Sequence, residues 1–457
     1  MVQQTREQWS GSRGFVLAVA GSAIGLGNIW KFPYMAGANG GGAFVLVYLL
    51  CILAIGVPIM IAEILVGRRG QSNPVAAMRA AAEESGVSPV WRLIGGMGVL
   101  AGFLILSFYS VIAGWALDYT LRGLTGALSG LGAEEAQAQF GSLLDSPGLQ
   151  IFWHTLFMLI CFLIVARGVR GGIEWAVGWM MPLLFLLILV LVGYGAWIGA
   201  FAEGFTFLFR PDFSQLGPES VLMALGQAFF SLSLGMGAVM AYGSYLSPQE
   251  SIGRNTVVVI TTDTIVALLA GLMIFPIVFS IGLEPQAGPG LLFQTLPYVF
   301  GQMVAGSFFG FLFFLLVVFA ALTSAISLLE PATAYLMARR GLSRLQAAGI
   351  LAVIAWILGI FSALSFNLMS GFHPLGFIDA LSGKTFFDLL DGVTSNIMLP
   401  LGGLGVALFV GWRMKRAAVA EEVRLGSYFG LWYFVLRFVS PVLVVLVLLY
   451  SVGVLRG

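Results

Sequence analysis

Two short stretches of the sequence bring polar side chains together with glycine. Residues 20–28 read AGSAIGLGN, and residues 231–239 read SLSLGMGAV. A glycine inside a helix costs roughly 1 kcal/mol relative to alanine, so both stretches predict local unwinding. Unwound backbone leaves N–H groups that can bind a carboxylate and carbonyls that can coordinate a hard cation. The polar side chains within these stretches are Ser22, Asn28, Ser231 and Ser233.

Close helix packing is the alternative interpretation of the glycines. A pattern of small residues four apart lets two helices approach closely, and it accounts for Gly21 and Gly25. Lys31 follows the first stretch directly, however, and a helix facing lipid would not tolerate a charge there. The polar groups and Lys31 together favour a binding site over packing alone.

The elements that would position these residues are membrane spans. Of the 457 residues, 59% are hydrophobic and only 9% are charged, against roughly 25% in soluble domains. So few charges could not cover the surface of a globular protein, and several apolar runs are near the ~20 residues that cross a bilayer. The net charge of +1 gives no field to attract polyanions. The composition predicts a polytopic protein in a lipid bilayer and excludes a soluble enzyme and a nucleic-acid partner.

Residues that usually carry catalysis or bind transition metals are sparse. Cys51 and Cys161 lie in apolar runs and are interpreted as small buried side chains. His154 and His373 are far apart, without a Cys or carboxylate cluster at metal-ligand spacing. A membrane enzyme would need a nucleophile with a base, or a metal cluster, at one depth. We therefore predict no catalytic residue and no enzyme activity.

Hydropathy predicts about eleven spans with mostly short loops. If the N-terminus is inside, most of the 22 Lys and Arg residues face the cytoplasm, whereas the opposite orientation reverses this excess. We expect a cytoplasmic N-terminus and, with an odd number of spans, an extracytoplasmic C-terminus. The expected spans lie near 14–36, 42–67, 93–121, 150–167, 174–200, 220–246, 257–283, 306–338, 346–363, 393–412 and 430–454.

The two glycine-rich stretches open two successive units of five spans. We interpret residues 1–457 as a single transporter domain, with a first repeat at about 14–200 and a second at about 220–412. An extra helix follows at about 430–454. Interrupted helices at matching places in two halves indicate a transporter binding site at the interface of the repeats.

Five motifs carry a specific resemblance. They are GSAIGLGNIWKFPY (21–34), NGGGAF (39–44), GQAFFSLSLGMG (226–237), GPGLLFQTLP (288–297) and ALTSAISLLEP (321–331). With them the sequence resembles the neurotransmitter:sodium symporter family over most of its length, and within it the eleven-span bacterial amino-acid transporters. The resemblance implies an all-α integral membrane fold of about 11 helices. This fold is a LeuT-type 5+5 inverted repeat whose helices 1 and 6 are unwound at mid-membrane.

The resemblance also implies two Na+ ions, held by oxygen ligands that suit a hard cation. The first site would combine the substrate carboxylate with Ala23, Asn28, Ser231 and Asp263. The second would combine carbonyls of Gly21, Ile24 and Ala320 with the hydroxyls of Thr323 and Ser324. The two hydroxyls have another interpretation, because helical Ser and Thr often bond to the preceding turn.

Asp263 departs from the family pattern, in which this ligand is asparagine. A carboxylate inside a span is costly unless it meets a cation or is protonated. Chloride-dependent relatives have a serine four residues further on, where this chain has Ala267, which cannot bind an anion. We expect Asp263 to replace chloride as the fixed negative charge, and its protonation after sodium leaves is a further hypothesis. A structural hydrogen bond to a neighbouring helix is the alternative.

The resemblance places an amino-acid substrate between the two breaks. Gly25 stands where monoamine members carry an aspartate, so the substrate should bring its own carboxylate, which Tyr109 would bind. Met236 adapts to differently shaped partners, although core packing also explains it, and an apolar lining argues against charged substrates. The residues expected around the substrate are Ser22, Ala23, Gly25, Gly27, Ile105, Tyr109, Phe230, Ser231, Ser233, Met236, Ala325 and Leu328.

An outer gate is expected above this site. Lys31 would pair with Asp391, with Asp388 as the second choice. Because lysine offers only a point charge where relatives have the bidentate arginine, this gate would be looser. Tyr109 and Phe230 would form an aromatic lid beneath it.

An inner latch and a support for the sixth span complete the expected site. Arg6, Trp9 and Tyr245 match the family's cytoplasmic latch, but its usual aspartate falls on Ala338, so Arg6 lacks the expected partner. Glu63 would accept hydrogen bonds from free N–H groups of the unwound sixth helix. We expect a latch that is not a simple ion pair.

Together with the composition, the resemblance implies a sodium-coupled symporter of a bacterial inner membrane. It would import hydrophobic L-amino acids, aliphatic and aromatic, by alternating access and without chloride. A membrane receptor that binds without turnover, or a transporter of another small carboxylate-bearing substrate, is the alternative. The preferred amino acid, the sodium stoichiometry and the oligomeric state stay open.

Overall fold

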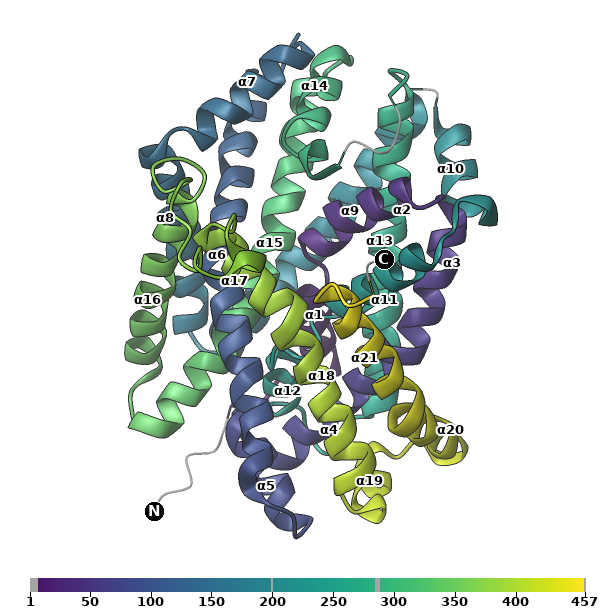
Figure 1. Cartoon of the computed structure of the whole chain (residues 1–457), viewed down its shortest axis with the longest axis vertical. Helices are drawn as coiled ribbons and strands as arrows, with labels where there is room; N and C mark the ends of the chain where they lie inside the picture. The colour runs from purple at the N-terminus through teal and green to yellow at the C-terminus, as the bar shows by residue number, and fades with distance from the viewer. Residues whose placement is uncertain (1–6, 199, 284–287, 456–457) are drawn as a thin grey trace.

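The protein is described by a computed structural model over residues 7–198, 200–283 and 288–455. Within these ranges the chain is a bundle of α-helices that contains no named strand, and a single β-bridge pairs Gly41 with Pro211. Most of the longer helices run along the long axis of the molecule, which is vertical in Figure 1. The prediction of an all-α fold is confirmed.

The helices succeed one another with short connections. In the first half they are α1 Ser12–Ala23, α2 Phe32–Ala38, α3 Gly42–Cys51, α4 Val57–Gly70, α5 Pro74–Glu84, α6 Arg92–Leu124, α7 Ala133–Leu144, α8 Pro147–Ala166, α9 Trp175–Trp197 and α10 Phe201–Phe209. In the second half they are α11 Pro218–Ser231, α12 Ala238–Gly243, α13 Ile252–Phe279, α14 Thr295–Gln302, α15 Gly306–Arg340, α16 Arg344–Leu364, α17 Phe386–Val393, α18 Leu399–Leu408, α19 Arg416–Val423, α20 Phe429–Phe434 and α21 Ser440–Ser451.

Nine continuous helical segments of the described chain are long and apolar enough to cross a membrane, and the bent pair Ser12–Ala23 and Gly27–Ala38 makes a tenth. The sixth expected span consists of α11 and α12, each too short to cross alone. Eleven spans are reached only when this interrupted segment is counted, so that number stays a prediction. The connection between the third and fourth expected spans contains α7, and the connection between the seventh and eighth contains α14.

The first span bends where its glycines cluster. The axes of Ser12–Ala23 and Gly27–Ala38 differ by 52°. Ile24 ends α1 in an extended conformation, with φ −74° and ψ 94°, so the helical hydrogen-bond ladder stops there. A Cβ on Gly25 would lie 2.6 Å from Ser324 Oγ and 3.2 Å from the Tyr109 hydroxyl, so a larger residue would displace these side chains. Glycine at position 25 thus allows α15 and Tyr109 to approach the break closely.

The second interruption has a different backbone geometry. Between the end of α11 and the start of α12, Ser233, Gly235 and Gly237 have φ of 54°, 78° and 72°. Glycine adopts such angles freely, whereas a residue with a Cβ does so at a cost in conformational energy. Strain of this kind persists where the surroundings hold it, so the conformation of Ser233 marks a candidate functional position.

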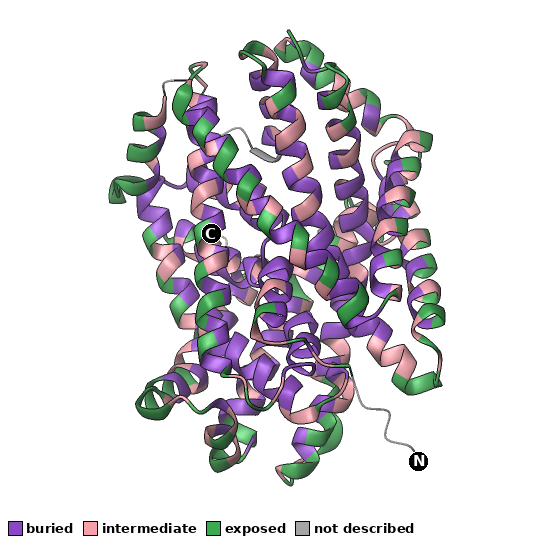
Figure 2. Ribbon diagram, turned by 180° about the vertical axis from the view of Figure 1, so that it is seen from behind, coloured by how far each residue is buried: buried purple, intermediate pink, exposed green. Residues whose placement is uncertain are grey.

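The centre of the bundle is formed by α6 and α15, which pack along each other and contact α12. In α15, 83% of the most apolar stretch of 18 residues is buried, whereas in the final span, Gly426–Ser451, only 22% of the corresponding stretch is buried. Figure 2 shows the same division, with buried residues inside and exposed residues along the outer helix faces and ends. The two interruptions thus lie against the most buried helices, away from the surface.

Candidate functional site

A small cavity lies between the two interruptions and the helices α6 and α15. Its volume is about 40 Å³, more than the ~10–15 Å³ that one water requires but well below the ~150 Å³ of a cavity that accepts benzene. Its walls combine backbone from the breaks with apolar and hydroxyl side chains. They are formed by Ser22, Ala23, Gly25, Leu26, Gly27, Ile105, Tyr109, Phe230, Ser231, Ser233, Met236, Ser324, Ser327 and Leu328.

Eleven of the twelve residues expected around the substrate line this cavity. Ala325 does not, because it is fully buried within the packing of α15, and that prediction is corrected. Sequence reasoning missed Leu26 and Ser327 as lining residues and named Ser324 only as a sodium ligand. Ser327 could have been found, because it follows Ser324 by about one helical turn on the same face.

A buried carboxylate adjoins the cavity. Asp263 has no exposed surface, and its oxygens accept hydrogen bonds from Asn28 Nδ2 at 2.8 Å and from Ser231 Oγ at 3.1 Å. Tyr48, which the sequence did not indicate, donates to Ser231 Oγ at 3.4 Å. No Lys, Arg or His of the described ranges forms an ion pair with Asp263. A carboxylate buried with neutral partners alone is costly, and a bound cation would relieve that cost.

A second cluster of oxygens lies where the end of α1 meets α15. Ser324 Oγ donates to the carbonyls of Ser22, at 3.1 Å, and of Gly21, at 3.4 Å. Thr323 Oγ1 donates to the carbonyl of Ala320 at 3.1 Å, the back-bonding that its helical position allows. Ser233 Oγ also donates to the Ser22 carbonyl, at 2.8 Å. Carbonyls at the end of α1 and a hydroxyl of α15 thus lie close enough together to bind one small cation.

Tyr109 faces the break in the first span. Its hydroxyl accepts a hydrogen bond from the backbone N–H of Leu26 at 3.5 Å and would lie 3.2 Å from a Cβ on Gly25. The phenol and this N–H, whose mutual hydrogen bond is long, lie at the same part of the cavity wall, where a carboxylate could accept from both. Beside it, Ile105, Met236 and Leu328 give the cavity an apolar end.

Glu63 of α4 supports the second interruption. Its Oε1 accepts a hydrogen bond from the backbone N–H of Gly235 at 2.7 Å, and the residue is buried. Because Gly235 has left the helix, this N–H has no helical partner. The contact is the one expected from the sequence, and it fixes the unwound segment to α4.

The expected outer ion pair is absent from this structure. In the described chain no ion pair joins Lys31 to Asp391: the Lys31 ammonium lies 4.4 Å from the ring centroid of Phe230, and Asp391 accepts from Ser395 Oγ at 2.8 Å. Asp388, the second choice, caps α17 by accepting from Thr385 Oγ1. The predicted pairing is therefore corrected for this conformation, since both carboxylates are held by their own helix.

A larger vestibule adjoins the cavity on the side of Lys31. It measures about 480 Å³ and is lined by residues of α2, α11, α18 and α21, among them Lys31 and Phe230. Phe230 also lines the small cavity, so it contributes to the walls of both spaces. The aromatic lid of Tyr109 and Phe230 stays a prediction.

The latch residues at the N-terminal end are only partly described. Arg6 lies outside the described residues. Trp9 donates from Nε1 to the carbonyl of Tyr242 at 3.0 Å, and its ring meets that of Tyr245 edge-on at 6.0 Å. The segment before α1 is therefore tied to the residues that follow the second interruption.

An ion pair that sequence reasoning missed continues this contact. Tyr245 donates from its hydroxyl to Glu330 Oε1 at 2.6 Å, and Arg344 Nη1 donates to Glu330 Oε2 at 2.6 Å. The Glu330 side chain is fully buried, and that of Arg344 is 15% exposed. Glu330 thus joins the N-terminal contact of Tyr245 to the start of α16.

Comparison with protein families gives a match over nearly the whole chain. The model of the sodium:neurotransmitter symporter family matches residues 6–136 and 134–456. The sodium-dependent transporter YhdH of Bacillus subtilis (strain 168) is 42% identical over 460 residues, with both chains covered completely. A sodium-dependent transporter of Haemophilus influenzae (strain ATCC 51907 / DSM 11121 / KW20 / Rd) is 36% identical, with 97% of each chain covered.

A solved structure matches the fold as well as the sequence. The crystal structure of MhsT in complex with L-phenylalanine superposes with a TM-score of 0.87 and is 46% identical. The match covers 98% of this chain and 100% of that one. The similarity therefore extends over nearly the whole described fold.

Proposed function

The chain belongs to the sodium:neurotransmitter symporter family, and from this premise we propose that it imports hydrophobic L-amino acids together with sodium. The observation that carries this proposal is the cavity between two helix interruptions, with the fully buried carboxylate of Asp263 beside it. The protein is a sodium-dependent, multi-pass membrane transporter. The substrate, the ion sites and the orientation are the proposed part.

The oxygen clusters are the proposed sodium sites. The first Na+ replaces the hydrogen bonds that Asn28 and Ser231 now make to Asp263, with the Ala23 carbonyl and the substrate carboxylate as further ligands. The second Na+ lies among the carbonyls of Gly21, Ile24 and Ala320 and the hydroxyls of Thr323 and Ser324. Ligand sets made only of oxygen favour hard cations such as Na+.

The substrate follows from the shape and polarity of the cavity. Leu26 N–H and Tyr109 hold the carboxylate, and the apolar end accepts the side chain. The relative MhsT was crystallised with L-phenylalanine, which supports a hydrophobic amino acid here. Since the cavity of about 40 Å³ is too small for an aromatic ring, Phe230 and Met236 must move when a large substrate enters.

Transport proceeds by alternating access, with the vestibule beside Lys31 open to the outside and the N-terminus in the cytoplasm. The two charges of two Na+ ions crossing ~100 mV release roughly 4.6 kcal/mol. That energy suffices for on the order of a thousandfold accumulation of a zwitterion, at ~1.4 kcal/mol per tenfold. A membrane potential that is negative inside therefore drives uptake, and an inward sodium gradient adds to it.

Uptake into proteoliposomes tests the proposal. Labelled leucine and tryptophan should accumulate when sodium is outside and the interior is negative, and a sodium ionophore should abolish accumulation. Glycine should accumulate less, because it has no side chain to bury in the apolar end. Sodium-dependent binding without accumulation would favour a receptor, and no sodium-dependent uptake of any amino acid would refute the proposal.

Chloride should not be required. Replacing external chloride with gluconate should leave the initial rate of leucine uptake unchanged, because Asp263 supplies the negative charge and Ala267, one turn further along α13, offers no hydrogen-bond donor to an anion. Replacing external sodium with N-methylglucamine is the matched control and should abolish uptake. A strict chloride requirement would contradict the assignment of Asp263.

A further inference from the structure

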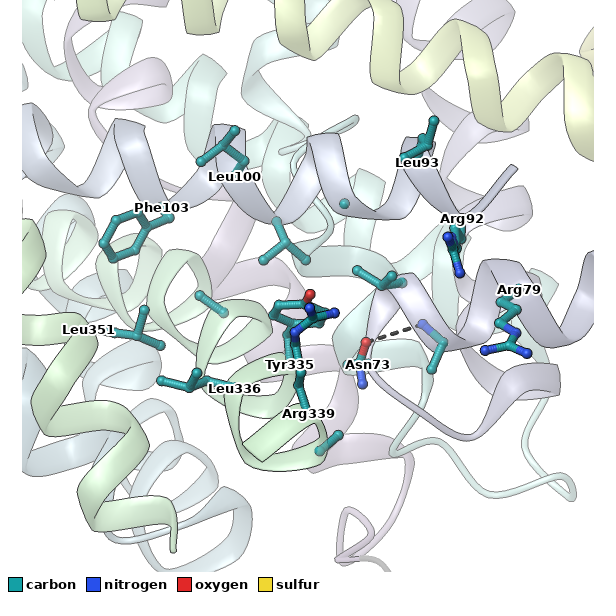
Figure 3. Close-up of a pocket in the computed structure, with 16 residues that line it drawn as sticks. Asn73, Arg79, Arg92, Leu93, Leu100, Phe103, Tyr335, Leu336, Arg339 and Leu351 are labelled. Atoms are coloured by element: carbon teal, nitrogen blue, oxygen red, sulfur yellow. Dashed lines mark hydrogen bonds between the residues drawn. The ribbon is translucent and has the colours of Figure 1, made fainter. Parts of the chain in front are cut away.

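A groove lies on the protein outside the proposed substrate site. It measures about 650 Å³ and lies between α5, α6, α15 and α16 (Figure 3), toward the end of the bundle where α5 and α19 are found (Figure 1). α6 and α15 also line the substrate cavity, but with other residues: Ile105 and Leu328 face that cavity, whereas Phe103 and Ala332 face the groove. The groove is therefore separate from the site described above.

The groove has a charged end and an apolar end. In Figure 3 the guanidinium groups of Arg79 and Arg92 lie on one side of the view, and Phe103 and Leu351 lie on the other. Along α6 the separation is eleven residues, from Arg92 at the start of the helix to Phe103, or about 16 Å at ~1.5 Å per residue. This length and polarity match a phospholipid whose head group lies at the helix ends and whose acyl chain extends inward.

The charge at the polar end is positive and only partly compensated. The groove is lined by Arg79, Arg92 and Arg339 and by no Asp or Glu of the described chain. Arg79 pairs with the exposed Glu83 at 2.7 Å, whereas no ion pair is formed by Arg92 or Arg339 within the described ranges. The Arg339 guanidinium instead lies 6.0 Å from the ring of Tyr335. Basic pockets between helix ends are typical binding sites for anionic lipid head groups.

We propose that this groove binds one anionic phospholipid. Its phosphate lies on the side of Arg92, with the Arg339 guanidinium beside Tyr335 further along the groove, and an acyl chain extends past Leu100 and Phe103 toward Leu351. Under the orientation proposed above, this end of the bundle faces the cytoplasmic leaflet, where anionic lipids are accessible. Lipid binding requires neither sodium nor substrate, so its test is independent of the transport assay.

Native mass spectrometry of the delipidated full-length protein in detergent measures the binding. Palmitoyl-oleoyl phosphatidylglycerol and the zwitterionic phosphatidylcholine with the same chains are titrated separately. Phosphatidylglycerol should form a one-to-one adduct at lower concentration than phosphatidylcholine. The double variant Arg92→Gln/Arg339→Gln should weaken that adduct by roughly 20- to 30-fold, since each basic side chain contributes ~1 kcal/mol to anionic lipid binding and ~1.4 kcal/mol is tenfold.

A second variant tests the apolar part of the groove and keeps both arginines. A Cβ on Gly96 would meet only Val75, at 3.9 Å, so Gly96→Leu fills the groove without a backbone clash. It should also weaken the phosphatidylglycerol adduct at least tenfold. Gly193→Leu, at a position of α9 with open space, and Arg340→Gln, next to the groove but outside its lining, are the matched controls and should bind normally.

Three results would overturn the proposal. Equal affinity for both lipids would remove the role of the arginines. Unchanged binding in Gly96→Leu would place the adduct elsewhere. An equal loss in Arg340→Gln would assign the effect to the general surface charge of this end of the protein.

Discussion

Asp263→Asn should lower sodium-driven leucine uptake by at least tenfold at limiting sodium, although the substitution keeps the shape of the side chain. The carboxylate is fully buried and accepts from Asn28 and Ser231, so both partners already point at the place proposed for the ion. Losing a charged partner of this kind costs ~1.5–3 kcal/mol, or roughly 10- to 150-fold in sodium affinity. The measurement is the sodium concentration for half-maximal uptake.

A double variant separates loss of charge from loss of fold. Ala267→Ser adds a hydroxyl at a buried position of α13, one helical turn from Asp263. In the Asp263→Asn background it should restore part of the uptake, and only when chloride is present, because an anion then supplies the missing charge. Unaltered sodium dependence in Asp263→Asn, or a rescue without chloride, would show that Asp263 does not provide the charge at the first sodium site.

Glu330→Met should destabilise the protein by about 3–5 kcal/mol, because it leaves the Arg344 guanidinium largely buried without its carboxylate. The double variant Glu330→Met/Arg344→Met should recover most of this loss, since apolar side chains of similar volume can replace a buried ion pair with little net cost. The free energy of unfolding, measured by titration with a denaturing detergent, gives the coupling of the two residues.

The exposed pair of Arg79 and Glu83 provides the control for this cycle. Glu83→Gln should leave the unfolding transition unchanged, because exposed ion pairs contribute little. If Glu330→Met is as stable as the parent, the pair between α15 and α16 is not a structural element. Loss of uptake with retained stability would then indicate a role of Glu330, through its contact with Tyr245, in closing the N-terminal end.

Part of the candidate site could be predicted because its signals are local. The interruptions were predicted from glycine within otherwise apolar helices. The energetic cost of burying the Asp263 carboxylate was predicted from its position within a span. The residues that line the cavity were predicted from the family motifs, in which residues adjacent in sequence have different roles. The error at Ala325 has the same origin, since a residue adjacent to Ser324 in sequence points about 100° away from it on a helix.

The outer gate could not be predicted in the same way. Whether Lys31 reaches Asp391 depends on how the segment after the first interruption lies relative to α17, which no local pattern encodes. The structure places the lysine over the ring of Phe230 instead, and Ser395 donates to the aspartate. The packing of these segments therefore decides which partner each charge has.

The sequence by itself determined the class of the protein, because scarce charge and long apolar runs are properties of composition, and it located the two interruptions, because glycine acts on its own backbone. Only the tertiary structure decided which distant groups meet. The pairing of Glu330 with Arg344 and the gathering of Arg92 and Arg339 around one groove both depend on how α5, α6, α15 and α16 pack. Packing is a property of whole helix surfaces brought together in space, and for that reason these contacts could be seen only in the folded chain.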